Sequence, residues 1–182
     1  MLKINLSDEV LVEIGKITVV FSLIEASLAE IIGIIVTVGG RPRQLGTIVT
    51  AELSFPQRVA LLSSLLLFAL GKNNEVVQEF ARLKPKLFQG EQQRNVVVHS
   101  VWAKQSDSVD SHAIVRLKAT AKHKTGLRAD FIKMGLQDLR RITDVLGEAY
   151  GQLCLFELHF HEEAHGFEPS SKEDAGCENP GG

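Results

Sequence analysis

The sequence predicts a mainly helical fold with long first and last helices and a small β-hairpin insertion at about residues 101–120. Apolar residues recur at steps of three and four along residues 10–38 and again towards the carboxyl end, which is the period of a helix. Between these regions, residues 113–119 alternate between apolar and polar side chains, as a half-exposed strand does. With 182 residues, 45% of them hydrophobic, the chain is long enough for one core. We therefore expect one domain over residues 1–165 and a disordered acidic tail over residues 166–182.

The first helix is expected to pack lengthwise on a neighbour. Ser7 is a suitable N-cap before the acidic residues Asp8 and Glu9, and Gly39-Gly40-Arg41-Pro42 would end the helix. At ~1.5 Å per residue this helix approaches ~45 Å, more than a compact bundle of this size needs. A partner chain could cover the excess length. The apolar seam consists of Val10, Ile14, Ile17, Phe21, Ile24, Leu28, Ile31, Ile35 and Val38.

Two further helices are expected in the middle of the chain. Ser54-Phe55-Pro56-Gln57 combines the spacing of a capping box with a proline in the first turn, and the helix would end at Gly71. Its composition is nearly all apolar, so we expect it to be central. The next helix should run over about residues 74–87. Pro85 near its end and Gly90 after it indicate a break or kink before a further helical segment.

The segment from Gln93 to Trp102 contains three consecutive valines, which favour a strand. A helix through Ser100 is the better prediction, because the apolar residues are consecutive and do not alternate. A helix would also place Asn95 and His99, which are four residues apart, on the same face.

The carboxyl-terminal half is expected to contain the hairpin, a basic loop over residues 122–128 and the final helix. Asp130 is a candidate N-cap for that helix. The apolar residues expected on its buried face are Phe131, Met134, Leu139, Ile142, Leu146, Leu153, Phe156 and Phe160.

The composition favours a cytoplasmic protein. Cys154 and Cys177 are the only cysteines, so neither a disulfide framework nor a cysteine-based zinc site is supported. The amino end lacks the basic start and apolar run of a secretory signal. Glu25 and Glu30 divide the apolar region of residues 17–38 into pieces shorter than the ~20 residues of a membrane span. We predict no membrane association.

Three polar residues beside the valines have the chemistry of metal-free RNA cleavage. That reaction needs proton transfer at the 2′-hydroxyl and at the leaving 5′-oxygen, and a fixed cation on the phosphate. The imidazole of His99 can transfer protons, Arg94 can bind a phosphate through two hydrogen bonds, and Asn95 could orient either. An arginine followed by a histidine after four to six intervening residues arises by chance roughly once in such a chain, and Arg116 with His123 also falls within this range. The second pair lacks a polar residue after its arginine.

Arg94-Asn95-Val96-Val97-Val98-His99 resembles the Arg-polar-x3-His signature of the HEPN superfamily. Ile24-Glu25-Ala26-Ser27-Leu28, Leu53-Ser54-Phe55-Pro56-Gln57-Arg58 and Val98-His99-Ser100-Val101-Trp102 are similar to segments of uncharacterised bacterial HEPN-like proteins. The resemblance covers roughly residues 10–160.

This resemblance implies a four- to five-helix bundle that forms a homodimer, with two copies of the motif facing each other across a cleft. It also implies a metal-independent endoribonuclease of the toxin or phage-defence type, with a possible antitoxin partner and no cofactor or metal. Arg94, Asn95 and His99 would be the catalytic residues. The predicted hairpin departs from the minimal bundle, and some members of the family only bind.

A basic region is the candidate RNA-binding surface. Although the net charge is only −2, there is no acid between Asp110 and Asp130. Basic side chains there could follow a phosphate backbone, and Trp102 could stack on a base, although a tryptophan is more often a core residue. The basic candidates are Arg116, Lys118, Lys122, Lys124 and Arg128.

Structural interpretations of the same residues stay open. Arg94 could pair with a carboxylate such as Glu91 or Glu25, and His99 could be an ordinary helix-end residue. Glu25 could hold Arg94, orient His99 or point outward. The alternative function is then a non-catalytic helical module for dimerisation or partner binding.

His161-Glu162-Glu163-Ala164-His165 matches the zinc-protease pattern in which two histidines four apart bind the metal. No third-ligand motif follows it. A solvent-exposed helix end is therefore the preferred interpretation, and we predict no metal site.

Overall fold

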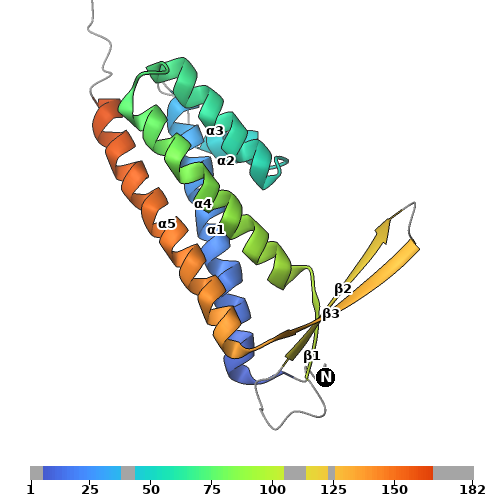
Figure 1. The fold of residues 1–182 in the computed structure, drawn as a ribbon. Helices are drawn as coiled ribbons and strands as arrows, with labels where there is room; N and C mark the ends of the chain where they lie inside the picture. Colours follow the sequence, from blue (N-terminus) through green and yellow to red (C-terminus); the bar gives the residue numbers. More distant parts are fainter. Residues whose placement is uncertain (1–5, 38–43, 105–113, 123–125, 166–182) are drawn as a thin grey trace, which may run out of the picture.

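The computed structural model describes residues 6–37, 44–104, 114–122 and 126–165, and the three strands are described by their backbone pairing. The described residues are mainly helical, which confirms that part of the predicted fold class (Figure 1). The helices are α1 (Asp8–Val36), α2 (Gln44–Thr50), α3 (Phe55–Leu70), α4 (Glu75–Val98) and α5 (Leu136–His165). The strands are β1 (Val101–Lys104), β2 (Ile114–Lys122) and β3 (Gly126–Met134).

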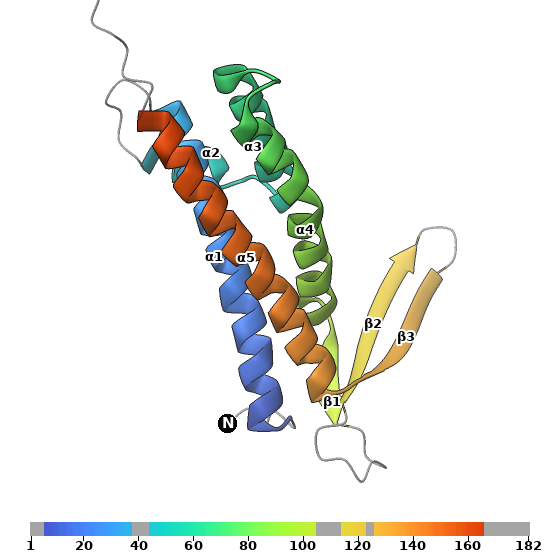
Figure 2. The ribbon, with the colours of Figure 1, turned by 60° about the vertical axis from the view of Figure 1, so that its left-hand side comes forward.

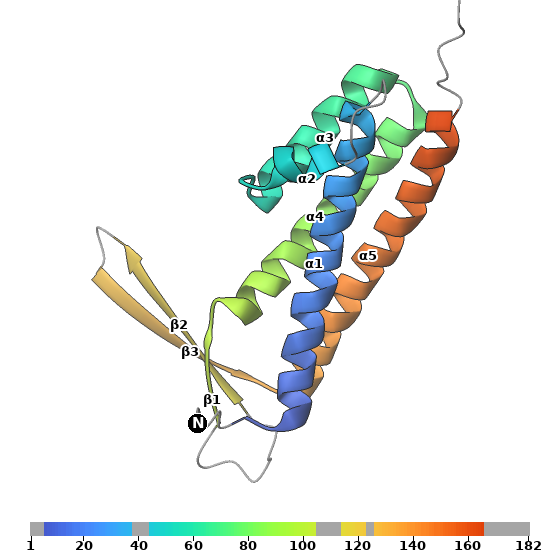
Figure 3. The ribbon, with the colours of Figure 1, turned by 180° about the vertical axis from the view of Figure 1, so that it is seen from behind.

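Helices α1, α4 and α5 pack against one another along their lengths and enclose the core. Helix α3 packs on α1 and α4, and α2 packs on α1. Figures 1 and 3 show α2 and α3 together at one end of the bundle, with the strands at the opposite end. The carboxyl end of α4 therefore lies between the helical core and the sheet.

Helix α1 confirms most of the predicted seam, of which Val38 lies outside the described residues. Its buried apolar residues include Val10, Ile17, Phe21, Ile24 and Leu28. By length and composition α1 could also cross a membrane, a property that the core helices of soluble proteins share. Its buried seam shows that this helix contributes one face to the protein core.

A polar contact joins α1 to α5 within this core. The buried carboxylate of Glu13 accepts hydrogen bonds from Lys16 Nζ at 2.8 Å and from Thr143 Oγ1 at 2.9 Å. The hydrogen bond from Lys16 lowers the pKa of Glu13 and outweighs the opposing effect of burial. The carboxylate is thus satisfied in its ionised form.

Helix α3 begins as predicted but occupies a different place. The Ser54 backbone N–H donates to Gln57 Oε1 at 2.8 Å, as the capping box requires. The prediction that this helix is central is wrong, because its outer face is open and Phe68 is 90% exposed. Helix α2, which the sequence analysis did not anticipate, lies beside α1 at the same end of the bundle.

A break or kink was predicted near Pro85 and Gly90, and the break is wrong because α4 runs through both residues without interruption. Pro85 lies inside the helix, where its ring nitrogen cannot donate to the carbonyl four residues earlier. Gly90 is buried, and a Cβ at this position would lie 3.0 Å from Leu146 Cδ2. The glycine therefore serves close packing of α4 on α5. The helix ends at Val98, two residues earlier than predicted.

The segment between α4 and α5 forms a three-stranded antiparallel sheet in the order β1-β2-β3. From the sequence, strands were expected only in a hairpin at about residues 101–120, and residues 122–128 were expected to form a loop. That assignment is corrected by β3, which pairs with β2 from Gly126 to Met134. The final helix consequently begins at Leu136, and Phe131 and Met134 belong to the sheet. Figures 1 and 2 show β2 and β3 extending away from the helices.

The contact between α4 and α5 contains a pH-dependent ion pair, His159 Nδ1 with Glu79 Oε2 at 2.7 Å. The hydrogen bond to Glu79 raises the pKa of His159 above its usual 6.5, with smaller contributions from Glu163 and Glu162. A raised histidine pKa contributes stability that is complete below the unfolded pKa and is lost as the pH rises through the folded pKa. We expect the melting temperature of the wild type to fall as the pH rises from the unfolded to the folded pKa of His159. The His159→Gln variant should lack this fall.

Thermal unfolding of both proteins from pH 5.5 to 8.5 checks this expectation, with Glu79→Gln as the matched partner variant. Parallel melting curves for the wild type and His159→Gln would contradict it.

Candidate functional site

The three residues of the motif lie together at the carboxyl end of α4. Arg94 and Asn95 are in the last turn of the helix and are half-buried. His99 is the C-cap, with its backbone N–H donating to the Asn95 carbonyl at 3.3 Å, and its side chain is exposed. The helix thus places the arginine and the asparagine towards the core and the imidazole towards solvent.

Arg94 Nη1 joins the other two side chains. It donates to Asn95 Oδ1 at 3.0 Å and lies 3.5 Å from His99 Nε2. Because an arginine only donates, a neutral imidazole facing it would accept at Nε2 and carry its proton on Nδ1. The Arg94 guanidinium thus lies beside the exposed His99 imidazole and is held by the side-chain oxygen of Asn95.

The rest of the guanidinium is held by aromatic packing from α1. Arg94 Cζ lies 5.1 Å from the centroid of the Phe21 ring, within the range of a cation–π contact. Phe21 in turn packs on Phe55 of α3, with ring centroids 5.0 Å apart. Within the described residues, no acceptor lies within hydrogen-bond distance of the buried Arg94 Nε. No described carboxylate lies within 4.0 Å of this guanidinium to form a salt bridge with it.

Glu91 is the acidic group beside the motif. It is half-buried and lies one turn before Arg94 and Asn95 on α4. Burial raises the pKa of Glu91, while the charge of Arg94 and the nearby Asn95 side chain lower it and the charge of Glu25 raises it further. The net effect is a raised pKa, so Glu91 takes up a proton more readily than an exposed glutamate does.

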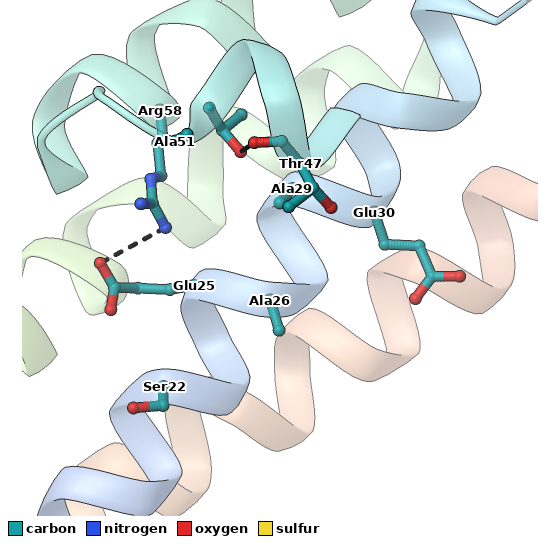
Figure 4. Close-up of a pocket in the computed structure, with 9 residues that line it drawn as sticks. Ser22, Glu25, Ala26, Ala29, Glu30, Thr47, Ala51 and Arg58 are labelled. Atoms are coloured by element: carbon teal, nitrogen blue, oxygen red, sulfur yellow. Dashed lines mark hydrogen bonds and ion pairs between the residues drawn. The ribbon is translucent and has the colours of Figure 1, made fainter. Parts of the chain in front are cut away.

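Glu25 faces Arg58 instead of the motif. Glu25 Oε1 lies 3.5 Å from Arg58 Nη1, an ion pair that Figure 4 shows between α1 and α3. Arg58 Nε also donates to the Leu53 carbonyl at 3.1 Å. The structure therefore gives Glu25 neither of the motif contacts that the sequence suggested.

The Glu25–Arg58 pair lies at the edge of a pocket between α1, α2 and α3. The pocket has a volume of about 550 Å³ and owes its space to small side chains. Its lining includes Ala26, Ala29, Thr47, Thr50 and Ala51 (Figure 4). Neither Arg94 nor His99 lines it, so the pocket and the motif are separate features.

Strand pairing relates the basic RNA-binding candidates to one another. Positions 116, 118 and 122 alternate along β2, and Arg128 of β3 pairs with Thr120. Trp102 of β1 pairs with Arg116. Because directly paired residues share a face, Arg116, Lys118, Lys122, Arg128 and Trp102 all belong to one face of the sheet. Lys124 lies outside the described residues.

Trp102 is also a structural residue. Its indole is half-buried against the core, and Nε1 donates to the Val97 carbonyl at 3.0 Å. This hydrogen bond ties β1 to the last turn of α4. The indole therefore supports the end of the helix that carries the motif.

The zinc-protease pattern lies at the end of α5. In the part of the chain that the structure describes, no group of three or more histidine, cysteine or acidic side chains is placed to hold a metal ion. His161 contacts the ring of Phe160, with centroids 6.2 Å apart.

The packing of Arg94 on Phe21 was not predicted from the sequence. No local pattern indicates this contact, because it depends on how α1 packs on α4. Glu91 was named as a possible partner of Arg94, and the charge of Arg94 does lower its pKa. Comparison with protein-family models, curated proteins and solved structures finds no match to this chain.

Proposed function

We propose that this protein is a HEPN-like, metal-independent endoribonuclease that acts as a homodimer. The observation that carries the proposal is the convergence of Arg94, Asn95 and the exposed His99 at the carboxyl end of α4, with Arg94 Nη1 3.5 Å from His99 Nε2. Among the described residues, no carboxylate lies within salt-bridge distance of the Arg94 guanidinium. Its charge is therefore available to a phosphate.

In the proposed reaction the 2′-hydroxyl oxygen attacks phosphorus and the 5′-oxygen leaves, which gives a 2′,3′-cyclic phosphate and a 5′-hydroxyl. His99 transfers one proton, either from the 2′-hydroxyl or to the leaving oxygen. Arg94 binds the non-bridging oxygens, on which negative charge increases in the transition state. Asn95 holds the guanidinium in place through Oδ1.

A second proton-transfer group would come from His99 of a second copy of the chain. Exposed apolar residues support such a pairing, because α1 carries Val12, Val19 and Leu23 on its outer face and α2 carries Ile48. A dimer that buries these residues would contain two copies of the motif, one from each chain. The basic face of the sheet would then bind the RNA backbone on either side of the cut.

End-labelled RNA incubated with the purified protein in excess EDTA tests the proposal. Wild type is expected to cleave and to leave cyclic phosphate ends, while His99→Ala loses at least about 100-fold in rate, the usual contribution of a positioned proton-transfer group. Gln92→Ala is the matched control, since Gln92 is an exposed residue on the same helix. Cleavage that requires added metal, or that His99→Ala retains, would contradict the proposal.

The second candidate is a non-catalytic dimerisation or partner-binding module. The observation that favours it is the exposure of large apolar side chains away from the motif, including Phe68 at 90% and Ile48 at 70%. A sedimentation experiment that finds a stable dimer, together with no RNA cleavage by wild type, would support this candidate.

A toxin role predicts that expression of the wild type, but not of His99→Ala, arrests growth unless an antitoxin is present.

A further inference from the structure

The two faces of the three-stranded sheet differ in charge. Directly paired residues of antiparallel strands share a face, and successive residues of one strand alternate between faces. The opposite face from Trp102 has one charged residue among the described strand positions, Lys133. The face that carries Trp102, here called the Trp102 face, has five basic residues and one acidic residue: Lys104, Arg116, Lys118, Lys122, Arg128 and Asp130.

The Trp102 face is the one turned towards the helical bundle. Trp102 and Met134 both belong to this face, and both are half-buried against the helical core. The indole N–H of Trp102 donates to the Val97 carbonyl in the last turn of α4 at 3.0 Å. Val101 and Lys133, which belong to the opposite face, are exposed. The face with most of the charge therefore adjoins the end of α4 that carries the motif.

Basic positions on this face follow one another at a regular distance. Arg116 pairs with Trp102 beside α4, and β2 then leads away from the helices (Figure 1). Alternate residues of a strand are ~6.6 Å apart, since each residue rises ~3.3 Å. Successive phosphates of an extended RNA strand have a comparable spacing, so such a row can contact one phosphate at each step. The basic row, over ~20 Å, consists of Arg116, Lys118, Arg128 opposite Thr120, and Lys122.

One acidic residue lies beside the basic row. Asp130 pairs directly with Lys118, and opposite charges at directly paired positions attract each other. Lys118 is therefore less available to a phosphate than the other members of the row are. Arg116, Arg128 and Lys122 have no acidic residue at their paired positions.

We propose that the Trp102 face binds one unpaired strand of RNA, which runs from the motif along β2 with its phosphates at the basic row. This inference rests on the proposed function and names its substrate as single-stranded RNA. A single row of cations contacts a single backbone, and in-line attack by the 2′-hydroxyl needs a backbone that can leave duplex geometry. In a homodimer, each chain would hold the RNA on one side of the cut.

Fluorescence anisotropy with 2′-O-methyl oligouridylates tests the inference, because these oligonucleotides lack the attacking hydroxyl and cannot be cleaved. Arg116→Gln should weaken binding of both a trinucleotide and an octanucleotide about fivefold at ~0.1 M salt, since each lost phosphate contact reduces the salt slope by ~0.7. Lys122→Gln should weaken binding of the octanucleotide by a similar factor. It should leave the trinucleotide unaffected, because so short a strand ends before Lys122.

Lys133→Gln is the matched control, because Lys133 is an exposed lysine of the same sheet on the opposite face. It should bind both oligonucleotides as wild type does, with the same salt dependence. Asp130→Asn should bind the octanucleotide more tightly than wild type, because it removes the negative charge opposite Lys118. The melting temperature of each variant checks that the fold is intact.

Three results would overturn the inference. Equal losses in Lys133→Gln and Arg116→Gln would show that overall charge, and not one face, binds the RNA. An equal effect of Lys122→Gln on both lengths would show that the strand does not run along β2. Tighter binding of an RNA duplex than of the single strand would contradict the assigned substrate.

These measurements separate the inference from the proposed function, because none of them depends on cleavage. If the variants follow the expected pattern but unmodified RNA is not cleaved, the binding face stands and the nuclease proposal fails. If RNA is cleaved in EDTA but Lys133→Gln and Arg116→Gln bind alike, the nuclease proposal stands and the binding face fails.

Discussion

Replacing Arg94 with alanine is expected to lower the rate of RNA cleavage by about 100- to 1,000-fold, the usual effect of removing one donor that stabilises a developing charge. The guanidinium is the only described group that touches both Asn95 and His99. Its loss therefore removes the phosphate contact and releases the amide at the same time. Single-turnover cleavage of end-labelled RNA in EDTA measures the effect.

Arg94→Lys should be almost as damaging as the alanine variant. Lysine keeps the positive charge, but it cannot offer two parallel donors to a phosphate, and its ammonium lacks the planar shape that packs on Phe21. We expect the lysine variant to bind non-cleavable RNA within a few-fold of wild type while cleaving at least about 30-fold more slowly. This separation of affinity from rate distinguishes a catalytic cation from a general electrostatic contribution.

Arg82→Ala is the matched control for both variants, because Arg82 is an exposed arginine on the same helix and outside the motif. It should cleave RNA at the wild-type rate. Equal losses in Arg82→Ala and Arg94→Ala would point to overall charge and would contradict the assigned role. Circular dichroism on each variant is needed because the cation–π contact with Phe21 contributes about 0.5–1 kcal/mol to stability.

The sequence was sufficient for those parts of the site that depend on neighbouring residues of one helix. Asn95 and His99 were predicted to lie on one face because a helix brings residues four apart together, and the structure places both side chains next to Arg94. The partner of Glu25 was not predictable in the same way. Its ion pair with Arg58 forms only because α3 crosses α1 at that level, and no local pattern encodes such a crossing.

The same distinction explains the errors in the fold. The capping box at Ser54 and the seam of α1 are local signals, and both predictions are confirmed. Gly90 was interpreted as a local break, but its small size is required by Leu146 on another helix. Phe131 and Met134 have a spacing that suits a helix, yet pairing with β2 places both in β3. Over so few residues, spacing alone could not distinguish a helix from a strand.

The packing of α2 on α1 could not be predicted from local sequence. A substitution at this contact is expected to have the largest effect on stability. Gly46 is buried where α2 crosses α1. A Cβ at this position would collide with the Ala29 carbonyl oxygen and would lie 2.5 Å from Gly33 Cα and 2.7 Å from Gly33 N. These are backbone atoms, which cannot turn aside as a flexible side chain would. We expect Gly46→Ala to lower the free energy of unfolding by about 2–3 kcal/mol, the upper range for overpacking.

Gly147→Ala is the matched control, because Gly147 is an exposed residue of α5 and a Cβ there would meet no atom within 4 Å. That change should raise the free energy of unfolding by about 0.5–1 kcal/mol, since alanine is the better helix former. Urea denaturation followed by circular dichroism measures both variants. Opposite signs for the two substitutions would establish that α2 lies backbone to backbone against α1, which is the contact that forms the Glu25–Arg58 pocket. Equal stabilisation of both would mean that α2 can move away from α1 without loss, and the pocket would then not be a fixed feature of the fold.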